Sequence, residues 1–294
     1  MQYITVSPFI KWAGGKSQLL NEIRKLYPKS VDRYCEPFVG GGAVLFDILK
    51  NFQPKEVLIN DINSQLINTY IQIRDNMNYV IESLSKIQEL YLHLDLEKRK
   101  EYYYKQRDRF NEGIAFFNIQ KSEMAVLFIF LNKTCFNGLY RVNKKGAFNV
   151  PMGAYKNPMI CDEKNLRNVS HLLKNVQISC GDYKNCKNFI DTDTFVYIDP
   201  PYRPLTATSS FTSYTKNEFG DKQQVELAKF VDCVSERGAK VVISNSDPKN
   251  INENDNFFDD IYSKHSITRI MAKRMINSKS NSRGAIKELL ISNY

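Results

Sequence analysis

The sequence predicts an α/β protein whose parallel sheet is interrupted by an inserted, mostly helical segment. Residues 33–61 carry a strand pattern, a glycine turn, an apolar helical stretch and a second strand pattern, which together form a βαβ unit. Short apolar runs typical of buried strands return at 176–179, 195–198 and 241–244. Because βαβ units build parallel sheets, these runs indicate further strands of the same sheet.

The region between these strands follows a different pattern. From 62 to about 175 the alternation stops, and residues 63–91 and 97–131 carry apolar positions at the spacing of helices. We therefore expect two units in the chain. They are a sheet domain formed by residues 1–62 and 170–294, and an inserted domain formed by residues 63–169.

The C-terminal part combines a strand pattern with a basic segment. Residues 288–292 alternate between apolar and polar side chains and predict an edge strand. Residues 264–287 hold seven Lys or Arg and no acid, with Asn, Ser and Gly among them. This composition predicts a basic loop.

Composition excludes several classes of protein. With 41 Lys+Arg against 32 Asp+Glu the formal charge is +9, which favours a polyanionic partner. No apolar stretch approaches the roughly 18 residues of a membrane helix, and we expect no secretory signal. The six cysteines are scattered without a C-x-x-C pattern, which predicts a reducing, cytoplasmic setting. The three histidines lie far apart in the chain, so we expect no metal site. Because no stretch is long and apolar enough to span a bilayer, we also expect no membrane partner.

A glycine turn follows the first predicted strand. Gly40 and Gly42 stand where glycines allow a tight turn and the close approach of a ligand. The dinucleotide pattern G-x-G-x-x-G is only partly met, because Leu45 occupies the third glycine position. Asp61 ends the next strand, a placement typical of a carboxylate that binds ribose hydroxyls. A nucleoside without a pyrophosphate fits this pattern better than NAD and favours S-adenosylmethionine, with a plain glycine turn as the alternative.

A second motif follows the predicted strand at 195–198. Asp199 and Tyr202 enclose two prolines, which have no N–H donors. The Asp199 carboxylate and the Pro200 carbonyl therefore form a surface of acceptors only, and the Tyr202 ring adds a flat face beside them. Acceptors next to a stacking face suit an exocyclic amino group on an aromatic base. The simpler alternative is an ordinary proline turn.

Four segments resemble the Dam-like (alpha-group) DNA adenine-N6 methyltransferases, which include the methylases of Dpn-type restriction systems. Residues 199–202 resemble the catalytic motif of this family, and residues 38–42 resemble its cofactor loop. Residues 8–16 resemble its N-terminal segment, and residues 137–143 with 148–151 resemble its DNA-contacting arm. The motifs occur in the family's order over nearly the whole chain.

The resemblance implies a Rossmann-like class I methyltransferase sheet, an inserted target-recognition domain, and S-adenosyl-L-methionine as the cofactor. In the implied reaction the target adenine is flipped out of duplex DNA. Tyr202 stacks on the adenine, while Asp199 and the Pro200 carbonyl accept its two N6 hydrogens. The cofactor-contacting positions implied by the match are Trp12, Lys16, Phe38, Gly40, Asp61, Asp182 and Asp199.

The same resemblance implies how DNA is bound. In the arm, defined as residues 133–156, basic and aromatic side chains mix around turn signals, which predicts a hairpin-like projection. Arg141 matches the position that binds guanine, and Phe136 matches an aromatic wedge. The implied target is GATC, methylated on its adenine. The other expected DNA contacts are Asn137, Leu139, Pro151 and Tyr155 in the arm, and Lys273, Arg274, Lys279 and Arg283 in the basic segment.

Several alternatives stay open at this point. Phe136 and Leu139 could belong to the arm's own small core rather than to a DNA-contacting face. N4-cytosine methylation uses the same acceptor geometry, although an Asp at position 199 favours adenine. A catalytically silent DNA-binding protein on the same scaffold is the third function considered, and the intact motif residues argue against it. Besides duplex DNA, a restriction endonuclease that acts on the same site is a possible partner.

Overall fold

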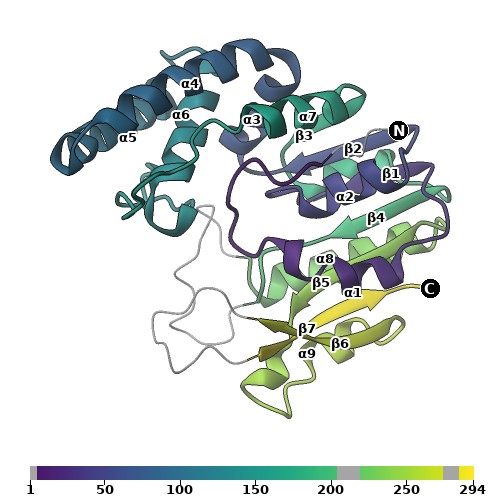
Figure 1. Cartoon of the computed structure of the whole chain (residues 1–294). Helices are drawn as coiled ribbons and strands as arrows, with labels where there is room; N and C mark the ends of the chain where they lie inside the picture. Colours follow the sequence, from purple (N-terminus) through teal and green to yellow (C-terminus); the bar gives the residue numbers. More distant parts are fainter. Residues whose placement is uncertain (1–4, 204–218, 274–284) are drawn as a thin grey trace.

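The computed structural model describes residues 5–203, 219–273 and 285–294, and its described strands form one seven-stranded sheet (Figure 1). The strands are β1 (Arg33–Glu36), β2 (Glu56–Asp61), β3 (Val176–Cys180), β4 (Thr194–Ile198), β5 (Lys240–Ser246), β6 (Ser266–Lys273) and β7 (Ala285–Ser292). Their order across the sheet is β3-β2-β1-β4-β5-β7-β6. The first five are parallel, and β7 runs antiparallel to both β5 and β6. The predicted α/β class with a mostly parallel sheet is confirmed.

The direction of winding reverses at β1, which pairs with β2 on one side and with β4 on the other. In open α/β sheets, ligands bind outside the carboxyl ends of the strands at such a switch point. We call the edge formed by the carboxyl ends of β1 to β5 the carboxyl edge. The sheet topology alone therefore directs attention to the loops that follow β1 and β4.

The predicted edge strand is wrong in its position. Residues 288–292 belong to β7, which lies inside the sheet between β5 and β6. The true edge strand is β6, and it begins at Ser266, within the segment that we expected to be a basic loop. Ile270 and Ala272 of β6 are buried, whereas Arg269 is only partly buried and pairs with carboxylates. Because an edge strand keeps polar and charged side chains on its exposed side, the cations hid its alternation.

Helices cover both faces of the sheet. Tyr34 and Phe195 contribute to the core on the side of α2 (Ala43–Asn51), and their neighbours Cys35 and Val196 contribute to the core on the side of α8. α8 spans Asp221–Ser235. The shorter helices that accompany the sheet are α1 (Leu20–Ile23), α9 (Phe257–Ile261), η1 (Lys16–Gln18), η2 (Arg24–Leu26), η4 (Tyr183–Asn188) and η6 (Pro248–Asn250).

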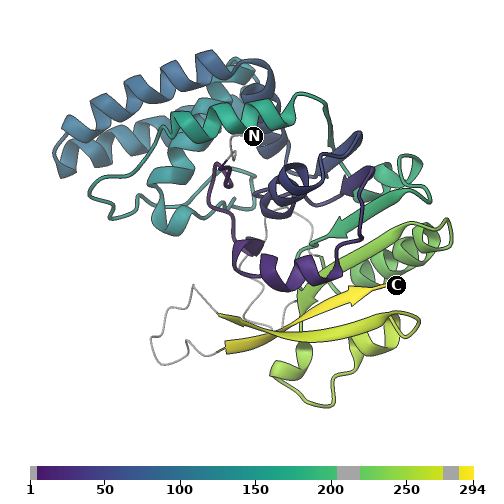
Figure 2. The same ribbon diagram turned by 45° about the vertical axis from the view of Figure 1, so that its right-hand side comes forward.

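The inserted region is helical, as predicted, and each of the two stretches with helical spacing contains two helices. Its helices are α3 (Ser64–Asp75), α4 (Met77–His93), α5 (Leu96–Phe116), α6 (Lys121–Thr134) and α7 (Glu163–Leu173), with η3 (Phe136–Gly138) after α6. Asn76 separates α3 from α4, and Phe117, in a left-handed conformation, ends α5. In both views α4, α5 and α6 lie together to one side of the sheet (Figures 1 and 2).

We call the inserted helices α3 to α7 the helical lobe. Two of them, α3 and α7, connect this lobe with the sheet. α3 packs against α6 and also against β2 and β3, while α7 packs against α2, α3 and α4. One continuous hydrophobic core therefore runs from the sheet into the lobe. The boundary at residues 62–63 and 169–170 stays a prediction. None of the described helices is long and apolar enough to cross a membrane.

Candidate active site at the carboxyl edge

Residues far apart in the sequence meet at the carboxyl edge. The glycine loop follows β1, Asp61 ends β2, Asp182 follows β3 and Asp199 follows β4. Parallel pairing places these strand ends side by side, since Asp61 is in register with Cys180. The local sequence marked each position, and the sheet order brings them to one place.

Asp199 is held by two donors. The Lys16 ammonium pairs with its Oδ2 at 2.7 Å, and the Ser244 hydroxyl donates to its Oδ1 at 2.9 Å. Burial raises the pKa of the Asp199 carboxyl, and both donors offset part of that rise because they stabilise the ionised form. The charge on this carboxylate therefore depends on Lys16 and on Ser244, which comes from the neighbouring strand β5.

Lys16 lies in the N-terminal segment at the start of η1, and only 4% of its side chain is exposed. Its Nζ also donates to the Gly14 carbonyl at 2.6 Å and lies over the Tyr202 ring, 4.7 Å from the ring centroid. The ammonium thus occupies the space between the Asp199 carboxylate and the face of Tyr202. An N–H donor fits at this position.

Tyr202 is anchored at its far end. Its phenol donates to Oε2 of Glu288 in β7 at 2.7 Å, which fixes the direction of the ring. Glu288 could not be predicted as this partner, because it lies 86 positions away in a strand expected at the edge of the sheet. No local pattern marks it.

The glycine loop packs against Trp12. Gly40 and Gly42 have positive φ angles of 47° and 76°, which favour glycine. A Cβ on Gly40 would lie 2.9 Å from the indole of Trp12, so a side chain there would displace the tryptophan. Asp61 Oδ2 accepts a hydrogen bond from the Gly40 amide at 3.1 Å, and burial raises the pKa of this carboxyl. The indole, the loop and the carboxylate are therefore packed as one unit.

Phe38 lies just before the glycine loop, and Asp182 follows β3. The Phe38 ring stacks on Tyr183, with centroids 5.2 Å apart and planes at 29°. Asp182 is exposed and caps η4 by accepting a hydrogen bond from the Lys184 amide at 2.8 Å. Both residues reach the carboxyl edge, as the match implied, but the role of each stays a prediction.

Two buried polar residues at this edge were missed. Glu36 ends β1, is only 2% exposed and accepts a hydrogen bond from the Tyr34 hydroxyl at 2.7 Å, while burial raises its pKa well above the usual range. Asn60 donates to the carbonyls of Pro37 and Gly181, which joins the loops after β1 and β3. Its Oδ1 is buried and has no protein partner among the described residues. A polar residue at the end of an apolar strand was the signal available for both.

The arm doubles back on itself, in agreement with the predicted hairpin-like projection. An antiparallel bridge joins Val142 to Phe148. Arg141 is exposed, and its Nε donates to Oδ1 of Asn149 at 2.8 Å. Phe136 is 51% exposed. Of the other predicted DNA contacts in the arm, Asn137 and Pro151 are exposed, whereas Leu139 and Tyr155 are partly buried.

The N-terminal segment connects the arm with the carboxyl edge. The ring of Tyr140 stacks on Trp12, with centroids 5.8 Å apart, and Lys11 Nζ donates to the Tyr155 hydroxyl at 3.1 Å. Five residues further along, Lys16 reaches Asp199. Trp12 and Lys16 therefore lie between the carboxyl edge and the arm. Arg141 and Phe136 are exposed on the arm.

The basic segment is only partly described. Lys273 ends β6, and Arg274, Lys279 and Arg283 lie outside the described residues. Within the described ranges, no group of three or more His, Cys, Asp or Glu side chains is arranged to hold a metal ion.

A sheet that reverses its winding at β1, with polar and glycine residues gathered where β1 and β4 end, is typical of Rossmann-like methyltransferases. We assign the protein to that class. The particular family follows from sequence comparison: the chain belongs to the D12 class N6 adenine-specific DNA methyltransferases, whose profile matches residues 12–276.

Curated DNA methyltransferases are similar to this chain over nearly their full length. The chain is 51% identical to the type II methyltransferase M.MjaIII of Methanocaldococcus jannaschii, covering 98% of this chain and 99% of that protein. It is 39% identical to the type II methyltransferase M1.LlaDCHI of Lactococcus lactis, covering 99% and 96%. It is 36% identical to the DNA adenine methylase of Haemophilus influenzae, covering 96% and 92%. Membership of this family identifies the reaction as adenine-N6 methylation. It argues against the two alternatives, N4-cytosine methylation and a catalytically silent DNA-binding protein.

Proposed function

We propose that this adenine-specific DNA methyltransferase takes its methyl group from S-adenosyl-L-methionine and transfers it to an adenine flipped out of duplex GATC. The family establishes the reaction on adenine N6. The proposal adds the donor, the extrusion of the base and the target sequence. A base edge within the duplex is out of reach of the partly buried Asp199 carboxylate, so extrusion is needed, at a cost of a few kcal/mol.

The observation that carries the proposal is the position of the Lys16 ammonium. It is bonded to the Asp199 carboxylate and lies over the Tyr202 ring. The ammonium lies between a hydrogen-bond acceptor and an aromatic face. The same position is suited to the exocyclic amino group of a base that stacks on the ring. In the proposed complex Asp199 and the Pro200 carbonyl accept the two N6 hydrogens. Accepting them draws the amino group out of conjugation and directs its lone pair toward the incoming methyl group.

The residues at the carboxyl edge fit S-adenosylmethionine. When bound, this cofactor supplies a methyl group already activated on a sulfonium. Glycine at position 40 leaves the loop without a side chain, Asp61 offers carboxylate oxygens for ribose hydroxyls, and the orphaned Oδ1 of Asn60 lies at the same edge. We propose that Trp12, Lys16, Phe38, Gly40, Asp61 and Asp182 contact the cofactor.

The target sequence is inferred from the arm. Arg141 is exposed, and a guanidinium is suited to bidentate contact with guanine O6 and N7. We propose that residues 63–169 form the target-recognition domain and that Phe136 enters the base stack. Ala154 departs from the Dam-like pattern, in which Arg can precede the tyrosine, so the resemblance does not extend to the preference for flanking bases.

Methyl transfer from radiolabelled S-adenosylmethionine to a GATC duplex, followed by nucleoside analysis, tests the proposal. We expect N6-methyladenine, formed faster on GATC than on each single-base variant. Label in N4-methylcytosine would contradict the reaction, and equal rates on all duplexes would contradict the target sequence. Relatives named type II methyltransferase support a restriction endonuclease of the same specificity as a partner. Protection of methylated DNA from cleavage at GATC tests that partner.

A further inference from the structure

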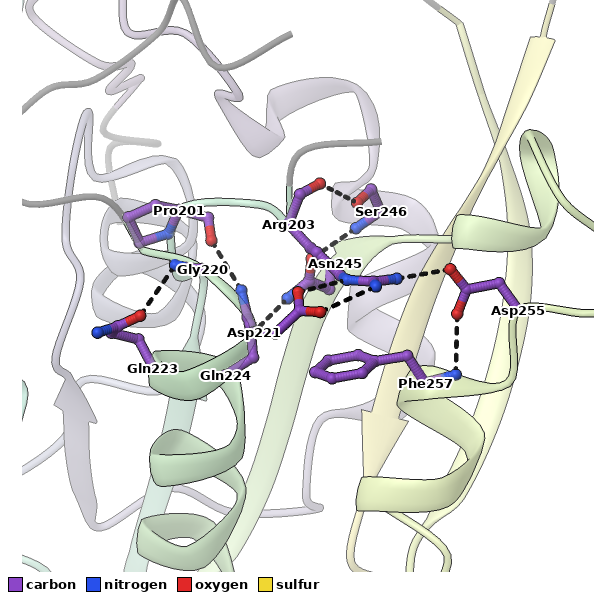
Figure 3. A network of polar contacts seen from close by, with 10 residues as sticks. All are labelled: Pro201, Arg203, Gly220, Asp221, Gln223, Gln224, Asn245, Ser246, Asp255 and Phe257. Atoms are coloured by element: carbon purple, nitrogen blue, oxygen red, sulfur yellow. Dashed lines mark hydrogen bonds and ion pairs between the residues drawn. The ribbon is translucent and has the colours of Figure 1, made fainter. Parts of the chain in front are cut away.

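A chain of buried amides reaches Pro201, the third residue of the Asp-Pro-Pro-Tyr turn (Figure 3). Gln224 of α8 donates from Nε2 to the Pro201 carbonyl at 3.0 Å, and its Oε1 accepts from Nδ2 of Asn245 in β5 at 3.2 Å. The Ser246 amide in turn donates to Oδ1 of Asn245 at 2.9 Å. Gln224 and Asn245 are 0% and 1% exposed, so water does not replace these partners.

This chain has only one possible polarity. A backbone N–H is always a donor, so Ser246 requires the oxygen of Asn245 on its side. The amide nitrogen of Asn245 must then face Gln224, which leaves the nitrogen of Gln224 to face Pro201. The main chain of β5 therefore sets the direction in which Gln224 offers its N–H. Two consecutive prolines offer no N–H of their own through which the turn could be fixed.

A second set of contacts holds the residue after Tyr202. The Arg203 guanidinium pairs with Asp221 at the start of α8 and with Asp255, at 2.7 Å in each case, and it lies over the Phe257 ring (Figure 3). The Ser246 hydroxyl donates to the Arg203 carbonyl at 3.3 Å. The main chain is therefore held immediately before Tyr202 and immediately after it.

We propose that Gln224 is a positioning residue for methyl transfer. By holding the Pro201 carbonyl it fixes the backbone of the turn, and with it the direction of the Pro200 carbonyl and the place of the Tyr202 ring relative to Asp199. Gln224 touches neither the base nor the cofactor. This inference rests on the proposed roles of Asp199, Pro200 and Tyr202.

The sharpest test is Gln224→Glu, which keeps the shape of the side chain. One oxygen of the introduced carboxyl still accepts from Asn245, while the other faces the Pro201 carbonyl. An ionised carboxylate repels that carbonyl, whereas a protonated carboxyl donates to it. We expect kcat to fall about 100-fold at pH 8, the loss typical of a misplacement near 1 Å. The ratio of variant to wild-type kcat should rise as the pH falls, with the KM for DNA changed less than about threefold.

Two further variants separate positioning from folding. Gln224→Met removes both hydrogen bonds without adding a charge, so its kcat should fall at every pH and its ratio to wild type should stay flat. Gln223→Met makes the same change one position earlier, where the amide oxygen accepts from the Gly220 amide and bonds no part of the described Asp-Pro-Pro-Tyr turn, and should keep kcat within about threefold. Circular dichroism and thermal melting confirm that each variant is folded. If Gln224→Glu does not fold, the loss of kcat in folded Gln224→Met decides.

Three results would overturn the proposal: a kcat for Gln224→Met within threefold of wild type, a pH-independent ratio for folded Gln224→Glu, or equal losses in Gln223→Met. Asp199→Ala is assayed in parallel. Turnover retained in Asp199→Ala would refute the proposed site itself. Turnover lost there but intact in both Gln224 variants would refute only the positioning role.

Discussion

The carboxyl edge and the arm are held in different ways. At the edge, buried and partly buried groups from separate elements hold one another: Lys16 and Ser244 bind Asp199, and Glu288 binds the Tyr202 hydroxyl. In the arm the backbone is held from outside, since the Asn111 side chain of α5 bonds both backbone groups of Phe148. Arg141 and Phe136, the side chains expected to bind guanine and to enter the base stack, are exposed.

This difference between the carboxyl edge and the arm reflects what catalysis and sequence recognition each require. Chemistry needs acceptors that are directed before the base arrives, so the edge is preorganised. Recognition needs polar groups whose hydrogen bonds can be exchanged for base edges, and the exposed bond of Arg141 to Asn149 is of that kind. Substitutions at the edge should therefore act on the rate for every sequence, whereas substitutions in the arm should act on the choice of sequence.

The largest expected effect is that of Asp199→Ala. It removes one of the two acceptors for the amino hydrogens, and kcat should fall by at least about 100 to 1,000-fold, the loss typical when one preorganised polar group is removed. Duplex affinity should change little, because phosphate contacts dominate it. Single-turnover rates and duplex titration measure the two quantities.

Cofactor affinity is measured on the same variant, since Asp199 is also an expected cofactor contact. Tyr202→Phe serves as the matched comparison, because it keeps the stacking ring and removes only the bond to Glu288. Appreciable turnover in Asp199→Ala would sink the assignment of the edge as the site of chemistry.

Arg141→Ala should show the opposite behaviour. Losing one bidentate contact to guanine removes about 1–3 kcal/mol of discrimination, or roughly 5 to 150-fold, at one G·C pair. Rates on GATC and on the duplex altered at that pair should therefore converge. Lys144→Ala, an exposed cation on the same arm, is the control and should leave the ratio unchanged. Full selectivity in Arg141→Ala would assign recognition elsewhere.

More of the carboxyl edge could be predicted from sequence than of the arm or of the amide network that holds the Pro201 carbonyl. Asp61 and Asp199 end apolar strands, and parallel pairing requires such ends to meet. The partners Ser244, Glu288 and Gln224 have no local mark, because each depends on which strand or helix becomes a neighbour. β6 was missed because the cations of an edge strand resemble those of a solvated loop.

The charge of Asp199 gives a third way to compare the regions. Burial raises its pKa and Lys16 lowers it, so the ionised acceptor is lost as the pH falls through that pKa. Lys16→Met removes the offsetting charge and should raise the pKa further, which moves the acid limb of the rate profile to higher pH. Single-turnover rates at saturating cofactor measure the limb. Arg141→Ala should leave it in place, and an unmoved limb in Lys16→Met would show that another group limits the rate.

The smallest expected effects concern stability and divide the arm itself. Leu139 is partly buried and packs against the main core, so Leu139→Ala should cost about 1–2 kcal/mol of unfolding free energy, below the range for fully buried leucines. Phe136 is 51% exposed, and Phe136→Ala should change stability by no more than about 0.5 kcal/mol. Urea titration measures both values.

The same pair of variants decides what Phe136 does. If its ring enters the base stack, Phe136→Ala lowers methylation of GATC although the protein is as stable as wild type. A ring that belongs to the arm's own core would instead lose stability and activity together, as Leu139→Ala is expected to do. Normal activity with normal stability would remove Phe136 from the DNA-contacting face. A large exposed aromatic side chain gains little from folding, so a loss of activity alone would mean that its exposure serves binding.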